Sequence, residues 1–239
     1  VLAGSVMASS CSLFFIDKDH SSSGGAGSLT VSLVYEDAMA RTDGSISSRN
    51  DRTVVPSLEA NAKAYVVSCS DASGKEVASV VITSLDSCVL KNLPAGSFTV
   101  TARAYSDATV HTSDRLIAQG SANVNLVQDG SAAVSIVLLY LNTETGSGNL
   151  SFSVQWPDSA ADSIKWYLDG NASAEPSIEY VNPSVGMRSA KLDKSGLPSG
   201  SHYLIIEFFL GTTHVGYAYE AVYICDNATS SHVVQNGSL

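Results

Sequence analysis

The chain has 239 residues, which is enough for one large or two small domains. Hydrophobic residues make up 44% of it and charged residues only 15%, so it can bury a core and is not expected to be disordered. The formal net charge is −10, with only 13 Lys and Arg. This charge argues against a nucleic-acid partner, and against binding to an anionic membrane by charge alone, since both need clustered basic side chains.

The first eleven residues form a short apolar run that ends in Ala8-Ser9-Ser10-Cys11. The run is similar to the end of a bacterial lipoprotein signal with a loose lipobox, although a basic start and an initiating Met are missing. We therefore expect a lipid on Cys11; the alternative is a chance cysteine behind a signal remnant. The run is shorter than the ~20 apolar residues that cross a bilayer, so any membrane attachment is expected through the lipid. Residues 21–27 are rich in Ser and Gly, and we interpret 1–26 as a signal remnant with a flexible tether.

The next part of the chain alternates apolar and polar residues in short runs, which is the pattern of half-buried strands. A first strand is expected over 28–35, and the polar stretch over 36–55 predicts a long loop. In 132–141 both faces are apolar, so this strand is expected to be covered on both sides. Between them we expect strands at 62–69, 77–83, 87–92, 98–105 and 115–127. Together these strands make a first module over 27–142.

A turn and the strand after it occur twice, as Leu93–Tyr105 and as Leu197–Phe209. In each copy Pro sets φ near −65° and Gly permits a positive φ, so each copy predicts a tight turn that leads into a strand. The start of the first module, 27–33, is likewise similar to 148–154. The repeat predicts a second module over 147–239. The predicted fold is all-β, with two tandem immunoglobulin- or fibronectin-III-like sandwiches.

Three stretches carry a resemblance to a known family: Arg52–Pro56, Leu93–Gly96 and Gly148–Pro157. They look like spirochaete (treponeme-type) surface lipoproteins, which have tandem immunoglobulin- or fibronectin-like repeats. The end of the chain, Gly216–Tyr223 followed by Asp226–Ser231, fits the same pattern. The resemblance implies an exported, lipid-anchored envelope protein without catalytic activity.

Four cysteines are present, and one of them is the predicted lipid site. Cys69 and Cys88 share inward parity in module 1, and an exported protein permits a disulfide between them. The alternative is two buried thiols that pack as small hydrophobic groups. Cys225 is expected to be an unpaired core or edge thiol.

No pattern typical of an enzyme, a metal site or a cofactor site stands out. The five histidines are scattered, and neither a CxxC, an HExxH nor a GxSxG motif occurs. His202 takes the place of Phe98 in the repeat, which favours a packed histidine over a catalytic one. We therefore predict no enzyme activity, no cofactor and no metal.

The aromatic residues of module 2 are the strongest indication of a binding role. Alignment with the first copy of the repeat sends Leu204, Ile206 and Phe208 inward and leaves the positions between them outward. An outward apolar stripe is typical of a partner surface or a sugar platform, unless a neighbouring module covers it. The candidate binding surface consists of Trp166, Tyr203, Ile205 and Phe209.

These observations lead to one function hypothesis and one alternative. The hypothesis is a lipid-anchored protein at the outer surface or in the periplasm, which acts as a non-catalytic adhesion, interaction or structural module. Its partners would be the membrane, through the lipid, and a host or envelope protein or a glycan. The alternative is a carbohydrate-binding accessory protein that uses the aromatic residues of module 2.

Overall fold

The computed structural model of the chain describes residues 26–35, 53–172, 178–182 and 186–234. Their regular secondary structure is β-strand throughout, apart from the short α1 (Leu58–Asn61) and the 3-10 turn η1 (Ser113–Arg115). The expected all-β, sandwich-type fold is confirmed. No helix in the described part of the chain is both long and apolar enough to pass through a bilayer. The predicted lipid site Cys11 and the tether lie outside the described residues.

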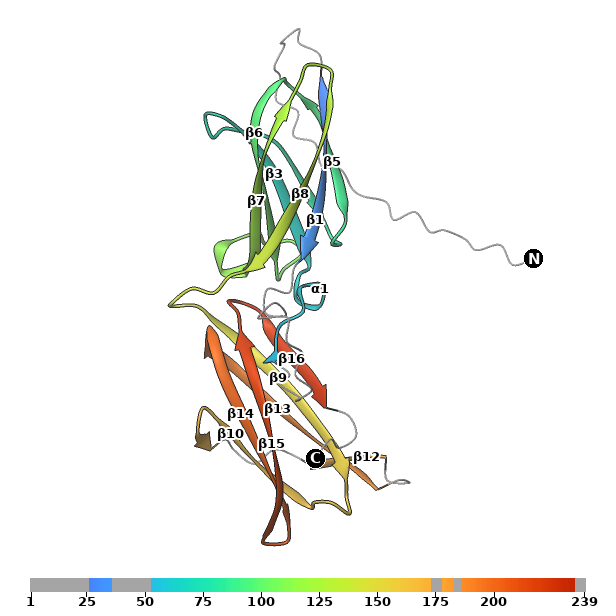
Figure 1. Cartoon of the computed structure of the whole chain (residues 1–239), viewed down its shortest axis with the longest axis vertical. Coiled ribbons are helices and arrows are strands. Elements are labelled where there is room, and N and C mark those ends of the chain that lie inside the picture. Colours follow the sequence, from blue (N-terminus) through green and yellow to red (C-terminus); the bar gives the residue numbers. More distant parts are fainter. Residues whose placement is uncertain (1–25, 36–52, 173–177, 183–185, 235–239) are drawn as a thin grey trace, which may run out of the picture.

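The first half of the chain forms a seven-stranded sheet that folds around its own core (Figure 1). Along the sheet its strands are β4 (Glu76–Ile82), β3 (Ala64–Asp71), β6 (Gly96–Tyr105), β7 (Leu116–Leu126), β8 (Ser131–Tyr140), β1 (Gly27–Tyr35) and β5 (Ser87–Leu93). Strands β7 and β8 pair only at Ala118 and Gln119, and the sheet folds at this seam. Inward side chains from both sides of the seam join one buried cluster, so the folded sheet works as a sandwich.

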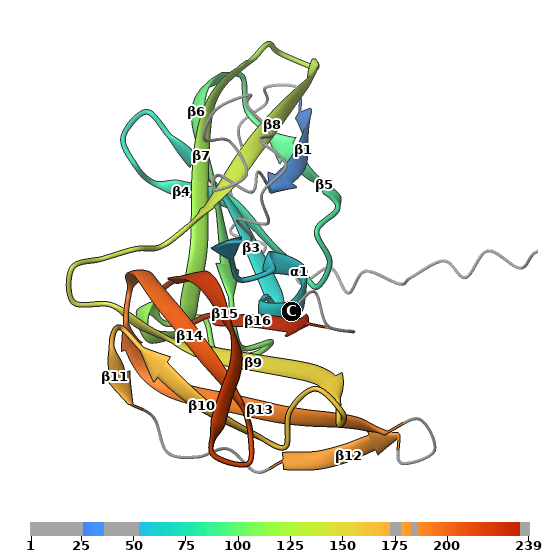
Figure 2. The ribbon, with the colours of Figure 1, turned by 60° about the horizontal axis from the view of Figure 1, so that its bottom comes forward.

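The second half of the chain forms two sheets that face each other (Figure 2). One sheet contains β11 (Asn171–Ala172), β10 (Ser163–Leu168), β14 (Gly200–Leu210), β15 (Thr213–Ile224) and β2 (Thr53–Val54), in this order. The other contains β12 (Ile178–Asn182), β13 (Met187–Pro198), β9 (Ser147–Pro157) and β16 (Thr229–Val234). A second buried cluster, with Trp156 and Trp166 as its largest members, fills the space between them.

The glycine of the repeated turn has a positive φ in both copies. Gly96 and Gly200 have φ of 152° and 130°, and each begins the strand that the repeat predicted, β6 and β14. Only glycine adopts such values at low cost, which is why the turn keeps Gly in both copies. The two halves also share a pairing, because the first strand of each lies parallel to the last: β1 with β8, and β9 with β16.

The joint between the halves is built from residues of both. Val54, from the first half, packs in the second cluster and extends the edge of β15 through β2. In return, Cys225 and Ala228 pack in the first cluster. The Asn61 side chain accepts a hydrogen bond from the backbone N–H of Thr229 (2.7 Å) and donates one to its carbonyl oxygen (3.0 Å). The division into modules 27–142 and 147–239 stays a prediction, since these elements cross it.

One expectation about strand coverage is wrong. The outer face of β8 is not covered: Leu139 is 50% exposed, and Val137 beside it is also exposed. Only the opposite face, with Ile136 and Leu138, is buried. The apolar residues on both faces suggested a strand between two layers, but β8 belongs to a two-layer sandwich, which buries one face of each strand.

Candidate functional site

The outer face of β10, β14 and β15 carries the residues that the sequence singled out. On β14 the side chains of Leu204, Ile206 and Phe208 are buried in the core, as the alternation predicted. The side chains between them therefore point away from the core. We call the outward set the tyrosine face; it comprises Lys165, Tyr167, Tyr203, Ile205, Glu207, Phe209, Tyr217 and Tyr219.

Three tyrosines of this face are strongly exposed. Tyr217 and Tyr219 of β15 are 70% and 57% exposed, and Tyr203 of β14 is 40% exposed. The rings of Tyr203 and Tyr219 lie 6.1 Å apart, with planes only 20° from parallel. The sequence placed Tyr203 on the candidate binding surface, whereas Tyr217 and Tyr219 counted only among the aromatic residues of module 2. Ala218 and Val222 of β15 point inward, so Tyr217 and Tyr219 fall on the outward positions of the strand. This alternation over 214–224 could have predicted their exposure from the sequence.

Polar contacts hold the half-buried members of the tyrosine face. The Tyr167 hydroxyl donates to the Glu207 carboxylate (3.0 Å), and this hydrogen bond, followed by burial, raises the pKa of the Tyr167 phenol. The Lys165 ammonium lies 4.9 Å from the centre of the Phe209 ring, within the range of a cation–π contact. The face thus combines aromatic area with one positive and one negative group.

A hydrogen-bonded clamp fixes the backbone at Tyr203. The Asp169 carboxylate accepts from the backbone N–H of Tyr203 (3.0 Å) and lies 2.6 Å from Nδ1 of His202. The other ring nitrogen of His202 is 2.7 Å from the carbonyl oxygen of Pro198. Burial acts to raise the pKa of Asp169, but the hydrogen bonds from His202 and Tyr203 outweigh it and the pKa is lowered. His202 is therefore a packed residue that positions a turn, in line with its place in the repeat.

The tyrosine face ends at an edge of β15 with which few described residues pair; we call it the open edge. On the side away from β14, β15 pairs only with the two residues of β2, at Ala221 and Val222. Among the described residues, none pairs with this side of β15 from Thr213 to Glu220. The backbone N–H and C=O groups of such an edge are available to another extended chain. The exposed Tyr217 and Tyr219 lie in this segment.

One predicted member of the binding surface is in the core instead. Trp166 is 1% exposed and packs edge-to-face against Phe152, with ring centres 6.0 Å apart. It shares the inward parity of Ile164 and Leu168 on β10, so its side chain faces away from solvent. Grouping it with Tyr203 by residue type overlooked this alternation.

Of the two alternatives for Cys69 and Cys88, the structure has the two buried thiols and not the disulfide. Both are buried thiols, on β3 and β5, which do not pair with each other. Their inward parity was predicted correctly. Burial raises the pKa of the Cys69 thiol to about 11. Cys225 is also a buried thiol.

Metal-binding groups do not converge in the part of the chain that the structure describes. No three or more His, Cys, Asp or Glu side chains there are placed to hold a metal ion. The tyrosine face instead presents exposed aromatic rings and one group of each charge, next to the open edge of β15.

Comparison with known proteins gives a likeness in overall architecture only. No protein-family model matches the chain, and no curated protein matches it. A candidate cell adhesion protein from Bacteroides eggerthii is 12% identical, and the match covers 92% of this chain and 89% of that protein. Its TM-score is 0.38. A fimbrial assembly protein from Parabacteroides distasonis is 10% identical, with coverages of 90% and 93% and a TM-score of 0.35.

A candidate adhesin from Bacteroides ovatus is 12% identical, with coverages of 81% and 77% and a TM-score of 0.36. At these scores the likeness carries no argument about function. None of the three proteins named comes from a spirochaete, so the treponeme-type origin stays a prediction.

Proposed function

We propose that the chain is a non-catalytic interaction module at the bacterial cell envelope, and that it binds a protein partner through the tyrosine face and the open edge of β15. The observation that carries this proposal is the exposure of Tyr217 and Tyr219 beside a strand edge with which no described residue pairs. Large exposed aromatic groups are uncommon on a surface that serves only for solubility. Gathered on one face, they are typical of interaction sites.

The chemistry of this face favours an extended protein segment. A strand that pairs with Thr213–Glu220 would form hydrogen bonds with the N–H and C=O groups on the open edge of β15. It would lie along the same edge as β2. Its side chains would alternate, so every second one would lie over Tyr217 and Tyr219. Tyr offers large contact area with little rotamer entropy to lose, and it is frequent among the residues that dominate binding energy.

Replacing both Tyr217 and Tyr219 with alanine is expected to weaken partner binding by at least about tenfold, because each ring contributes buried contact area. A phage library of random linear peptides, selected on the immobilised full chain, supplies the ligands. Affinities for the parent and the double variant are then compared by calorimetry. Bound peptide should also slow amide hydrogen exchange over Thr213–Glu220.

The matched control is the double variant Val137→Ala/Leu139→Ala, which removes exposed apolar side chains from the outer face of β8. It should bind the selected peptides as the parent does. Peptides that bind the tyrosine variant at full strength, or that protect a different strand, would refute the proposed surface.

A second candidate, carbohydrate binding on the tyrosine face, is favoured by the nearly parallel rings of Tyr203 and Tyr219. An exposed aromatic ring offers a face on which a sugar ring can stack. If the peptide selection yields no binder, and cellohexaose or maltohexaose binds the parent chain but not Tyr219→Ala, the partner of this face is a glycan.

We further propose that a lipid on Cys11 holds the protein at the envelope. Cells that make the protein, fed a clickable palmitate analogue, should incorporate the label into the parent chain. They should not label Cys11→Ser, because the thiol is the attachment point. Labelling that persists in Cys11→Ser, or none in either form, contradicts the anchor.

A further inference from the structure

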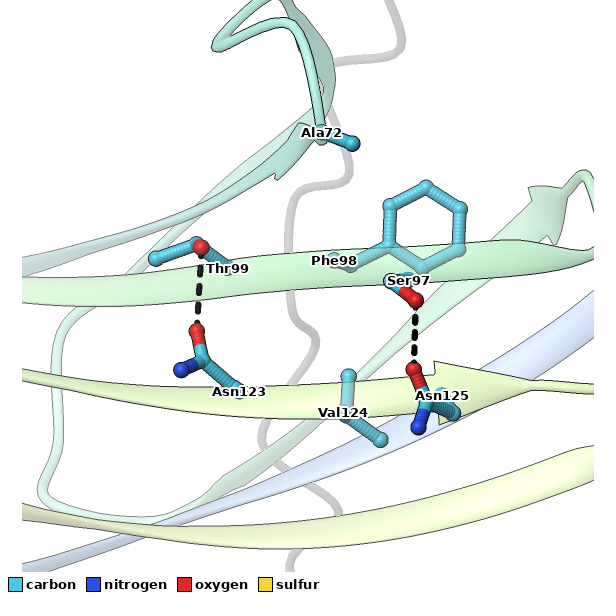
Figure 3. A pocket seen from close by; sticks show the side chains of 7 residues that line it. All are labelled: Ala72, Ser97, Phe98, Thr99, Asn123, Val124 and Asn125. Carbon is cyan, nitrogen blue, oxygen red and sulfur yellow. Dashed lines mark hydrogen bonds between the residues drawn. The ribbon is translucent and has the colours of Figure 1, made fainter.

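A polar hollow lies on β6 and β7 (Figure 3). Its volume is about 390 Å³, and it is lined by Ala72, Ser97, Phe98, Thr99, Asn123, Val124 and Asn125. Two cross-strand pairs bridge the strands in it. The Ser97 hydroxyl donates to the side-chain oxygen of Asn125 (2.6 Å), and the Thr99 hydroxyl donates to that of Asn123 (3.0 Å).

The two pairs repeat because of the sheet register. Ser97 is directly opposite Asn125, and Thr99 is directly opposite Asn123. Residues two apart on a strand point to the same face, so the pairs lie side by side, about 7 Å apart along the strands. All four side chains are exposed.

These pairs leave specific hydrogen-bonding groups for a ligand. Each asparagine uses its side-chain oxygen for the hydroxyl, so both N–H groups of each amide are left without a partner among the described residues. Each hydroxyl oxygen keeps lone pairs that can accept a hydrogen bond. The hollow therefore offers four amide donors, with hydroxyl acceptors between them.

This set of groups selects a class of ligand. None of the seven lining residues is charged, and the chain has a net charge of −10, so an anion would find no counter-charge. An apolar ligand would cover the two amides and remove their water without replacing its hydrogen bonds. A neutral ligand with several hydroxyl groups can both accept from the amides and donate to the oxygens.

We propose that this hollow binds a neutral carbohydrate through the amide groups of Asn123 and Asn125. One sugar ring with hydroxyls on opposite sides spans both amides. Ala72, at the wall of the hollow, is small enough to leave room for the ligand.

The hollow is separate from the tyrosine face. Asn125 is near one end of β7, whereas Leu116, at the other end, accepts a hydrogen bond at the joint from Asn227 (3.0 Å). The two residues are nine positions apart on the strand, which is about 30 Å. The two surfaces can therefore be tested independently.

The test uses the full chain with cellohexaose, maltohexaose and mannohexaose as neutral probes and an oligogalacturonate as the anionic probe. At least one neutral probe should bind, and the oligogalacturonate should not. Asn123→Asp/Asn125→Asp keeps the shape but removes all four amide donors. It should weaken binding by about tenfold or more, since several hydrogen bonds are lost together.

Two controls make each outcome decisive. Asn171→Asp makes the same change at an exposed position on β11 and should bind as the parent does. Thermal unfolding of the Asn123→Asp/Asn125→Asp variant checks that it is folded, and Thr99→Val provides a second, uncharged variant that should also weaken binding. The proposal is overturned if no neutral probe binds. It is also overturned if binding survives in both hollow variants, or if it is lost only in Tyr219→Ala.

Discussion

Trp156→Ala is expected to lower the free energy of unfolding by about 3–5 kcal/mol, the largest effect of any single change considered. Trp156 is completely buried between the two sheets of the second half. Its ring contacts Phe208 edge-to-face, with centres 5.8 Å apart, and its indole N–H donates to the carbonyl oxygen of Ala161 (2.9 Å). Alanine would leave a large cavity and would also remove the only hydrogen bond that the indole makes.

Urea unfolding followed by circular dichroism measures this loss. Trp156→Phe is the informative comparison, because it keeps a ring and loses the N–H donor; its expected cost is about 1–3 kcal/mol. Tyr217→Phe, on the exposed face, should leave the urea concentration at the midpoint of unfolding unchanged. If Trp156→Ala unfolded at the parent's midpoint, the ring would not be a core residue and the packing described for β9 would be wrong.

Gly148→Ala is expected to cost about 1–3 kcal/mol, through overpacking at the joint. A Cβ at this position would overlap the carbonyl oxygen of Cys225 and would lie 2.7 Å from that of Ala228. Both atoms belong to the backbone, so they cannot move away by a change of rotamer as side-chain atoms can. They belong to the turn whose residues pack in the first cluster, so β9 would have to move away from the joint.

Gly216→Ala supplies the matched control, because a Cβ there would have no atom within 4 Å and the backbone φ is not positive. Its stability should stay the same or rise slightly, since alanine restricts the unfolded chain more than glycine does. Thermal unfolding of the two variants under identical conditions makes the comparison. Equal stability for both would mean that the close approach at Gly148 is not rigid.

Local patterns in the sequence determined a good part of this protein. The Pro-Gly repeats placed the starts of β6 and β14, because a positive φ at Gly is a property of the residue itself. Alternation divided the side chains of β14 between two faces, and alignment with the first copy of the repeat indicated which of these faces the core. The same rule, applied to β10, would have placed Trp166 inside.

Only the tertiary structure decided which strands become neighbours and what each face meets. The parallel pairing of β1 with β8, the transfer of β2 to the edge of β15, and the exposed outer face of β8 depend on contacts between residues far apart in the chain. So does the hollow, since Ser97 and Asn125 form a pair only through the register of β6 and β7. Alternation assigns side chains to two faces, but packing between distant segments decides which face is covered and which is left to bind a partner.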